Sequence, residues 1–216
     1  RGQPRSRGLG DVYKRQVVLI PHGIDPADVE GVEPFDPGYP YVLALGRFRR
    51  FKGFDLLIRA FGLMLDRCPD ARLILAGDGK LGPQLRELAR PLGERVVFAG
   101  PVAGERKFAL LKGCRLFAFP SRPGREGFPN ALLEAMACGA PVVATAVSGA
   151  EDLLEEGGGV LVPPEDPEAL AEAMLELWRD GSRRARLAED ARRVAARYHI
   201  SDIARRYVEV YARCLR

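Results

Sequence analysis

The sequence predicts an α/β protein whose core is a doubly wound, Rossmann-like parallel sheet with helices on both faces. Short apolar runs of strand length alternate along the chain with longer segments in which apolar residues recur at helical spacing. The apolar runs are continuous rather than broken by polar residues, so both faces of each strand are expected to be covered. Strands and helices that alternate in this way are typical of strand–helix–strand units that build one parallel sheet.

The predicted strands are short apolar runs. They lie at residues 17–20, 41–45, 72–76, 96–99, 116–119, 142–145 and 159–162. A turn at residues 21–26 and an irregular, proline-rich passage to Pro40 separate the first run from the second.

The predicted helices occupy most of the intervals between these strands. They lie at residues 55–68, 81–92, 105–112, 129–138, 168–179, 183–198 and 201–214. In the first of them the apolar residues of one face are Leu56, Leu57, Ala60, Phe61, Met64 and Leu65. The fourth is expected to carry Pro129 in its first turn, where the missing N–H costs nothing, and to be closed by Gly139.

Several loops that directly follow predicted strands are expected to share one rim of the sheet. These loops are residues 46–53, 77–82, 100–104 and 120–130. In open parallel sheets, ligands bind beyond the carboxyl ends of the strands. We therefore expect a ligand to be held by residues of these loops.

The last of these loops leads into the stretch around which the predicted site is organised. The backbone N–H groups of Gly127, Phe128 and Asn130 lie at a helix start, where free donors and the helix dipole favour an anion. Glu126 precedes this helix and Glu134 lies within it. Carboxylates beside an anion site suit sugar hydroxyls, so the pattern predicts a receptor for a sugar nucleotide. The alternative for each glutamate is a favourable charge on the dipole or a solvated side chain.

The loop at residues 46–53 carries four basic residues between Gly46 and Gly53. An arginine such as Arg47 can grip a phosphate bidentately, while a lysine such as Lys52 acts as a point charge, so the two could neutralise a diphosphate without a metal. The chain contains no Asp-x-Asp sequence, the usual carboxylate set for a metal–sugar-nucleotide complex. We therefore predict no metal ion and no cofactor. The alternative is a solvated basic turn.

Residues 77–82 match the pattern Gly-x-Gly-x-x-Gly between a predicted strand and a predicted helix. This pattern would suit an NAD-dependent oxidoreductase if the next strand ended in an acidic residue for the ribose. That strand instead ends in Ala99-Gly100-Pro101. We interpret the glycines as permitting a tight turn and the close approach of a ligand.

Composition excludes several classes of protein. The net charge of +4 arises within residues 1–16, so it is no argument for nucleic-acid binding. The cysteines and histidines lack the spacing of a zinc site or a disulfide framework.

No apolar run reaches the length of a transmembrane helix, and no secretory signal is present, so a cytoplasmic protein is expected. The arginine-rich C-terminal helices are expected to be solvated, with peripheral membrane attachment as the alternative.

Three parts of the chain are expected to differ in role. Residues 1–16 have neither a helical nor a strand period and are predicted to be an artefactual or disordered leader. Residues 17–200 are predicted to form the ligand-binding α/β domain. Residues 201–216 are predicted to form a separate C-terminal helix.

Several elements together resemble the donor-binding domain of retaining glycosyltransferases of the GT-B type, family four (glycosyl transferases group 1). They are Gly46-Arg47 with Lys52-Gly53, Gly77-Asp78-Gly79, Glu126 and Glu134 with seven residues between them, and the run from Glu134 to Ala144. They occur in one consistent order. The resemblance implies that a sugar is transferred from a nucleoside diphosphate sugar, with retention at the anomeric carbon, to a glycan or lipid-linked acceptor.

The resemblance also implies roles for individual residues. Arg47 and Lys52 match the pair that holds the donor diphosphate and stabilises charge on the leaving phosphate. Glu126 matches the glutamate near the donor sugar. The remaining residues assigned to donor binding are Gly46, Gly127, Phe128, Asn130, Glu134 at the ribose, and Val102 in the loop that faces the base.

The family's proteins have a second, N-terminal domain that binds the acceptor, and this sequence shows no match to it. The chain is therefore expected to bind a donor but to be inactive alone. The C-terminal helix of residues 201–216 would pack on that N-terminal domain, so its apolar side is expected to be exposed here. The alternatives are a non-catalytic nucleotide- or glycan-binding module, a related glycan phosphorylase and a sugar-nucleotide epimerase.

Overall fold

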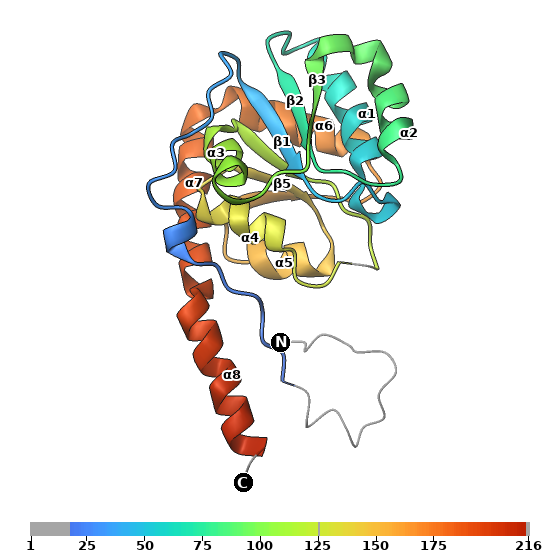
Figure 1. The fold of residues 1–216 in the computed structure, drawn as a ribbon. Coiled ribbons are helices and arrows are strands. Elements are labelled where there is room, and N and C mark those ends of the chain that lie inside the picture. The colour runs from blue at the N-terminus through green and yellow to red at the C-terminus, as the bar shows by residue number, and fades with distance from the viewer. Residues whose placement is uncertain (1–17, 125, 215–216) are drawn as a thin grey trace.

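The computed structural model describes residues 18–124 and 126–214, which form a parallel six-stranded sheet between two layers of helices (Figure 1). The strands are β1 (Tyr41–Leu45), β2 (Arg72–Ala76), β3 (Val96–Gly100), β4 (Leu116–Phe119), β5 (Val142–Thr145) and β6 (Gly159–Val162). Their order in the sheet is β3-β2-β1-β4-β5-β6. Every neighbouring pair is parallel, which confirms the predicted doubly wound sheet.

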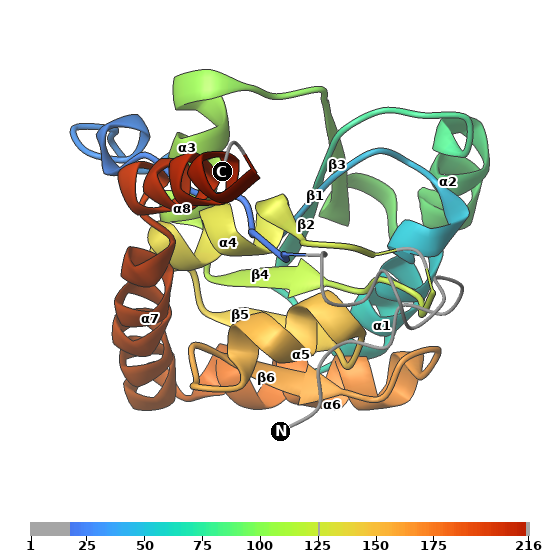
Figure 2. The ribbon, with the colours of Figure 1, turned by 90° about the horizontal axis from the view of Figure 1, so that it is seen from below.

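The helices divide between the two faces of the sheet. One face is covered by α1 (Phe54–Leu65), α2 (Gly82–Ala89) and α6 (Pro167–Arg179). The other is covered by α3 (Gly104–Gly113), α4 (Asn130–Ala137), α5 (Ser148–Leu154) and α7 (Gly181–Ala195). Figure 2 shows α3 and α4 on one side of β1 and β4, with α1 and α6 on the other.

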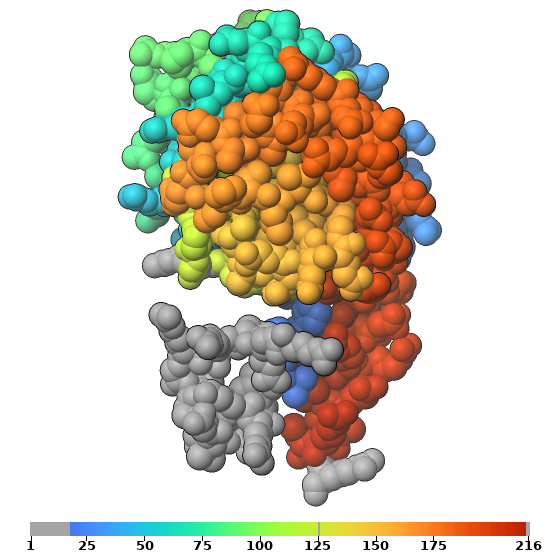
Figure 3. Space-filling model, turned by 180° about the vertical axis from the view of Figure 1, so that it is seen from behind, coloured from blue at the N-terminus to red at the C-terminus, as the bar shows by residue number. Residues whose placement is uncertain are grey.

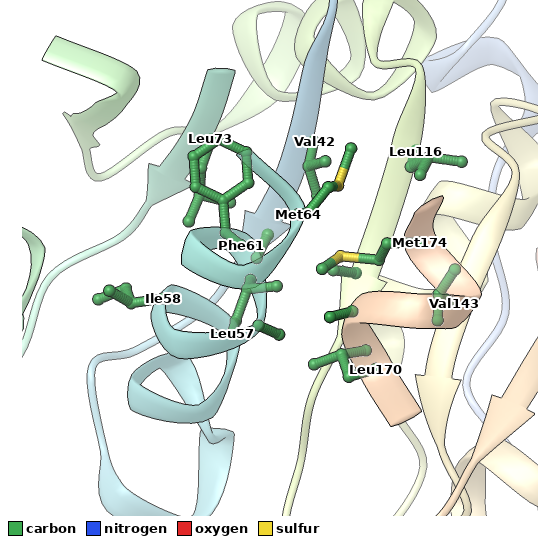
Figure 4. Packing of buried hydrophobic residues seen from close by; sticks show 14 of the residues in the cluster. Val42, Leu57, Ile58, Phe61, Met64, Leu73, Leu116, Val143, Leu170 and Met174 are labelled. Carbon is green, nitrogen blue, oxygen red and sulfur yellow. The ribbon is translucent and has the colours of Figure 1, made fainter. Parts of the chain in front are cut away.

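Each strand contributes side chains to both layers of the core. Val42 of β1 packs with α1 and α6, whereas its neighbour Leu43 packs in the opposite cluster. In the first layer, Phe61 of α1 and Met174 of α6 converge on the sheet, and both are fully buried (Figure 4). Burial of one such side chain contributes about 1.5–3 kcal/mol, so this layer fixes the positions of the loops that leave the sheet.

The structure corrects several predicted boundaries. Residues 18–20 form no strand, and Val17 lies outside the described residues. The helix predicted at residues 81–92 ends at Ala89, because Pro91 and the non-helical Gly93 (φ 57°) turn the chain into a 3-10 segment. The helix predicted at residues 55–68 ends at Leu65, ahead of Pro69.

The fourth helix, α4, begins one residue later than predicted. Pro129 is its N-cap residue, with φ −85° and ψ 86°, so it precedes the first turn rather than lying in it. Gly139 closes the helix with φ 69°, as expected. The sequence analysis also missed α5, whose seven residues are too few for a recognisable helical period.

The last helix, α8 (Ile200–Cys214), extends away from the body of the molecule (Figures 1 and 3). Ile203 is buried, whereas Tyr207, Val208 and Tyr211 are 42, 65 and 63% exposed. The apolar side of this helix is therefore uncovered, as the sequence predicted. The predicted leader at residues 1–16 lies outside the described residues.

Among the residues that the structure describes, no helix is both long enough and apolar enough to cross a membrane.

Candidate functional site

The strand order reverses between β1 and β4, and this reversal positions the candidate site. The connection after β1 runs to α1 on one face of the sheet, and the connection after β4 runs to α4 on the other. The two loops therefore part beyond the carboxyl ends of the strands and leave a crevice between them. The first loop carries Arg47 and Lys52, and the second carries Glu126.

The rim loops are tied to one another through their backbones. Phe48 N donates to Asp78 O over 2.8 Å, and Gly77 N donates to Gly100 O over 2.7 Å. A Cβ at Gly77 would lie 1.9 Å from Gly46 O, so only glycine permits this approach. The glycines of this loop thus allow tight packing between loops, which agrees with their interpretation as turn residues.

A cavity of about 560 Å³ opens at this rim. Its volume falls within the usual range for sites that bind small molecules. Its lining brings together most of the residues predicted to bind a donor, namely Gly46, Arg47, Val102, Asn130 and Glu134.

Lys52 and Glu126, which are not among the residues that line this cavity, form an ion pair between the loops that follow β1 and β4. Lys52 Nζ lies 2.7 Å from Glu126 Oε1, and their side chains are 20% and 7% exposed. Ser121, which is buried, donates from its Oγ to the same carboxylate oxygen over 2.7 Å. The aliphatic part of Lys52 passes Gly46, whose hypothetical Cβ would be 3.8 Å from it. The ammonium group is therefore held against a buried acid, and the methylene groups of Lys52 lie beside Gly46, which lines the cavity.

Glu134 also has a lysine partner, Lys107 in the first turns of α3. Lys107 Nζ lies 2.9 Å from Glu134 Oε1, and both residues line the cavity. The sequence analysis missed Lys107. Its position three residues beyond the loop at 100–104, itself assigned to the rim, was the signal that could have identified it.

The predicted N–H donors lie where α4 begins. The N–H groups of Gly127, Phe128 and Asn130 donate no backbone hydrogen bond within the described part of the chain. The ring of Phe128 packs beside Tyr198, with ring centroids 5.5 Å apart. A Cβ at Gly149 of α5 would lie 2.1 Å from Gly127 O, so α5 supports this loop directly.

Arg122, another residue that the sequence analysis missed, joins the walls of the crevice. Its Nη1 and Nη2 donate to the two carboxylate oxygens of Asp55, each over 2.8 Å, and Nη1 also donates to Arg50 O over 2.6 Å. Its Nε donates to Glu165 Oε1 over 2.8 Å. One guanidinium thus links the loops that follow β1, β4 and β6.

The charge of Asp55 depends on this contact. Burial would raise the pKa of Asp55, but the hydrogen bonds and charge of Arg122 outweigh it and hold the pKa below its usual value. The lowered pKa means that the pair stabilises the fold above the unfolded pKa of about 3.9, and that this stabilisation is lost as pH falls through the lower folded pKa.

We expect Arg122→Met to lower the free energy of unfolding by about 2 kcal/mol at neutral pH, because two charge-assisted hydrogen bonds to Asp55 are lost. Urea unfolding measures this change, and Arg59→Met on the exposed side of α1 is the control. The difference between wild type and Arg122→Met should shrink below about pH 4 as Asp55 takes up a proton. An equal difference at all pH values would show that the ion pair is not its cause.

No group of three or more histidine, cysteine, aspartate or glutamate side chains is placed to hold a metal ion within residues 18–124 and 126–214.

Comparison with known proteins identifies the family to which the chain belongs. The family model described as glycosyl transferases group 1 matches residues 39–180. The D-inositol 3-phosphate glycosyltransferase of Corynebacterium urealyticum is 36% identical over 93% of this chain and 52% of its own length. The phosphatidyl-myo-inositol mannosyltransferase of Mycobacterium leprae is 34% identical over 90% of this chain and 53% of its own length.

A solved structure supports the same relationship. Anabaena HepE, crystallised in complex with UDP-glucose, superposes with a TM-score of 0.78 at 27% identity, over 89% of this chain and 56% of HepE. The chain thus spans about half the length of the curated relatives that it matches.

Proposed function

The chain belongs to the glycosyl transferases group 1 family, and from this premise we propose that its rim cavity binds a nucleoside diphosphate sugar as the donor for glycosyl transfer. The observation that carries the proposal is the meeting of two cations and two carboxylates at one crevice. Arg47 and Glu134 line the cavity, and Lys52, whose methylene groups lie beside the lining residue Gly46, pairs with Glu126. The relative HepE, which was crystallised with UDP-glucose, supports this choice of ligand.

The diphosphate is proposed to lie between Arg47 and Lys52. A guanidinium can hold two phosphate oxygens at once, and an ammonium group adds a point charge. The N–H groups of Gly127, Phe128 and Asn130, which donate to no backbone oxygen in the described part of the chain, are proposed to add donors from the start of α4. As the bond from the sugar to the phosphate breaks, these groups stabilise the negative charge that collects on the diphosphate. We propose that they do so without a metal ion.

The rest of the donor is proposed to extend from the diphosphate in two directions. Glu134 accepts hydrogen bonds from the ribose hydroxyls, and the base lies along the loop at Pro101 and Val102, which forms the far part of the cavity. Glu126 lies beside the sugar. In the structure each glutamate is paired with a lysine, so donor binding requires Lys52 and Lys107 to share their charge with the ligand.

The acceptor is proposed to be a glycan or a lipid-linked sugar, and transfer is proposed to retain the configuration at the anomeric carbon. Both assignments rest on the resemblance to the family. The names of two relatives, D-inositol 3-phosphate glycosyltransferase and phosphatidyl-myo-inositol mannosyltransferase, agree with a lipid-linked or phosphorylated acceptor. We propose that this chain binds the donor and does not transfer sugar by itself.

Calorimetry with UDP, GDP and ADP tests the proposal, and we expect one of the three to bind with an affinity that EDTA does not change. That nucleotide should bind about tenfold more tightly than its 2′,3′-dideoxy form, because a carboxylate holds the ribose hydroxyls. In Glu134→Ala this preference should disappear. Absence of binding by all three nucleotides in a folded sample would overturn the proposed function.

A further inference from the structure

Two buried residues with hydroxyl groups, Ser121 and Thr145, lie where β4 and β5 end. Among residues 18–124 and 126–214 they are the only serine, threonine, asparagine, glutamine or charged residues that are buried. The two strands pair in the sheet, which brings their ends together (Figure 2). A buried hydroxyl group costs free energy unless it makes a hydrogen bond. The partners of these two groups therefore indicate what keeps them in the core.

The two hydroxyl groups link β5 to the carboxylate of Glu126. Thr145 Oγ1 donates to Ser121 O over 2.5 Å, and Ser121 Oγ donates to Glu126 Oε1 over 2.7 Å. Thr145 thus holds the backbone of Ser121, and the side chain of Ser121 holds the carboxylate. The next residue, Arg122, donates from its backbone N to Phe51 O over 2.7 Å, so Ser121 is also fixed from the loop after β1.

Glu126 depends on such contacts more than Glu134 does. Glu134 lies within α4, whose backbone sets the direction of its side chain, whereas Glu126 lies in the irregular loop before that helix. A side chain on a loop is held less precisely than one on a helix unless its neighbours restrict it. One restriction is on the backbone, since a Cβ at Gly149 would lie 2.1 Å from Gly127 O. The other is the hydrogen bond from Ser121, which acts on the carboxylate itself.

The two oxygens of the Glu126 carboxylate have different surroundings. Oε1 lies 2.7 Å from the hydroxyl group of Ser121 and 2.7 Å from the ammonium group of Lys52. Oε2 accepts no hydrogen bond within the described part of the chain. A carboxylate oxygen has about two sites that accept hydrogen bonds, so the two partners of Oε1 occupy them. Oε2 remains able to accept a hydrogen bond from a ligand.

We propose that Ser121 and Thr145 are positioning residues for the donor sugar, because they hold the Glu126 carboxylate so that Oε2 accepts a hydrogen bond from a sugar hydroxyl. This inference rests on the proposed function, in which Glu126 lies beside the sugar. Ser121 acts on the carboxylate directly, and Thr145 acts through the backbone of Ser121. Their hydroxyl groups are therefore expected to matter for the sugar of the donor and much less for its nucleoside diphosphate.

Calorimetry with three pairs of ligands tests the inference: UDP and UDP-glucose, GDP and GDP-mannose, and ADP and ADP-glucose. For the pair that binds, the ratio of the two affinities measures what the sugar contributes. Ser121→Ala should shift this ratio about tenfold against the sugar form, because the hydrogen bond to the sugar is no longer oriented. Thr145→Val, which removes a hydroxyl group and keeps the branched shape, should shift it about threefold in the same direction.

Three further variants separate positioning from a general loss of stability. Thr145→Ser retains the hydroxyl group and should keep the wild-type ratio. Val143→Ala removes buried volume from the same strand without touching these hydrogen bonds, so it should lower the free energy of unfolding and leave the ratio unchanged. In Glu126→Ala there is no carboxylate to hold, so adding Ser121→Ala should cause no further shift. A further shift would show that Ser121 does not act through Glu126.

A crystal structure of Ser121→Ala without ligand provides a second measurement. The Glu126 carboxylate should leave its wild-type position or occupy several positions, whereas in Val143→Ala it should stay in place. This measurement decides the inference where a nucleoside diphosphate binds and its sugar form does not.

The possible failures can be told apart. An unmoved Glu126 carboxylate in Ser121→Ala, or a ratio equal to that of wild type, would overturn the inference and leave the proposed function standing, because the nucleotide still binds. If none of the six ligands binds, the proposed function fails, and the inference that rests on it fails as well.

Discussion

Replacing Lys52 with alanine is expected to weaken the binding of the nucleoside diphosphate by about 100-fold. A hydrogen bond between charged groups contributes about 1.5–3 kcal/mol, and Lys52 is proposed to make one to the diphosphate. The substitution also leaves the carboxylate of Glu126, which is 7% exposed, without its cation. An unpaired buried carboxylate beside the diphosphate repels it, so the loss should lie at the upper end of that range.

A second substitution separates these two causes. In Lys52→Ala/Glu126→Gln the repulsion is removed, while Ser121 can still bond the side chain at position 126. We expect this double variant to bind the nucleotide more tightly than Lys52→Ala and more weakly than wild type. Calorimetry measures all three proteins, circular dichroism checks their folding, and Arg59→Ala is the control for lost surface charge. If the double variant binds no better than Lys52→Ala, repulsion between the Glu126 carboxylate and the diphosphate is not part of the loss.

The fold could be predicted because its signals are local. Strands such as β1 and β4 are continuous apolar runs, and such runs are typical of a parallel sheet with helices on both faces. The failures lie where local signals are weak. The run at residues 18–20 is apolar but makes no strand, and α5 is too short to show a period. Tertiary packing determines the conformation of both segments, and this packing cannot be read from a single sequence.

The candidate site, like the fold, was predictable where the sequence carries a recognisable pattern. Arg47, Lys52, Glu126 and Glu134 were predicted from their places in a basic loop and at a helix start, and from the family pattern. The crevice between β1 and β4 explains why residues so distant in sequence meet. Their partners were not identified. Lys107 and Ser121 carry no pattern of their own, and they matter only because the fold brings them to Glu134 and Glu126.

Arg122 was missed for a related reason. Its partners Asp55, in the first turn of α1, and Glu165, in the loop after β6, lie 67 and 43 residues away along the chain, and only the finished sheet brings them together. Nothing in the local sequence distinguishes it from the other arginines of the chain. Ion pairs between segments that are distant in sequence are therefore the part of this site that only the three-dimensional structure reveals.

Gly53→Ala is expected to lower the free energy of unfolding by about 3 kcal/mol or more, the largest effect on stability among the changes considered. Gly53 has φ 65° and caps the start of α1, and a Cβ there would lie 1.9 Å from the carbonyl oxygen of Pro120. Because that oxygen belongs to the backbone just after β4, it cannot move without displacing the strand or the helix. Gly100 provides the matched control, since it has φ 70° with nothing within 4 Å of a Cβ.

Gly100→Ala should therefore lose only the cost of the left-handed conformation, about 1 kcal/mol. Urea unfolding of the two variants isolates the steric part, and equal losses would show that the approach of Gly53 to Pro120 is not constrained. The contact also lies where the loops after β1 and β4 part, one residue from Lys52 and one from Ser121. A shift that moves Gly53 away from Pro120 is expected to displace Lys52 relative to Glu126. We therefore expect nucleotide affinity to fall together with stability in Gly53→Ala, and to fall less in Gly100→Ala.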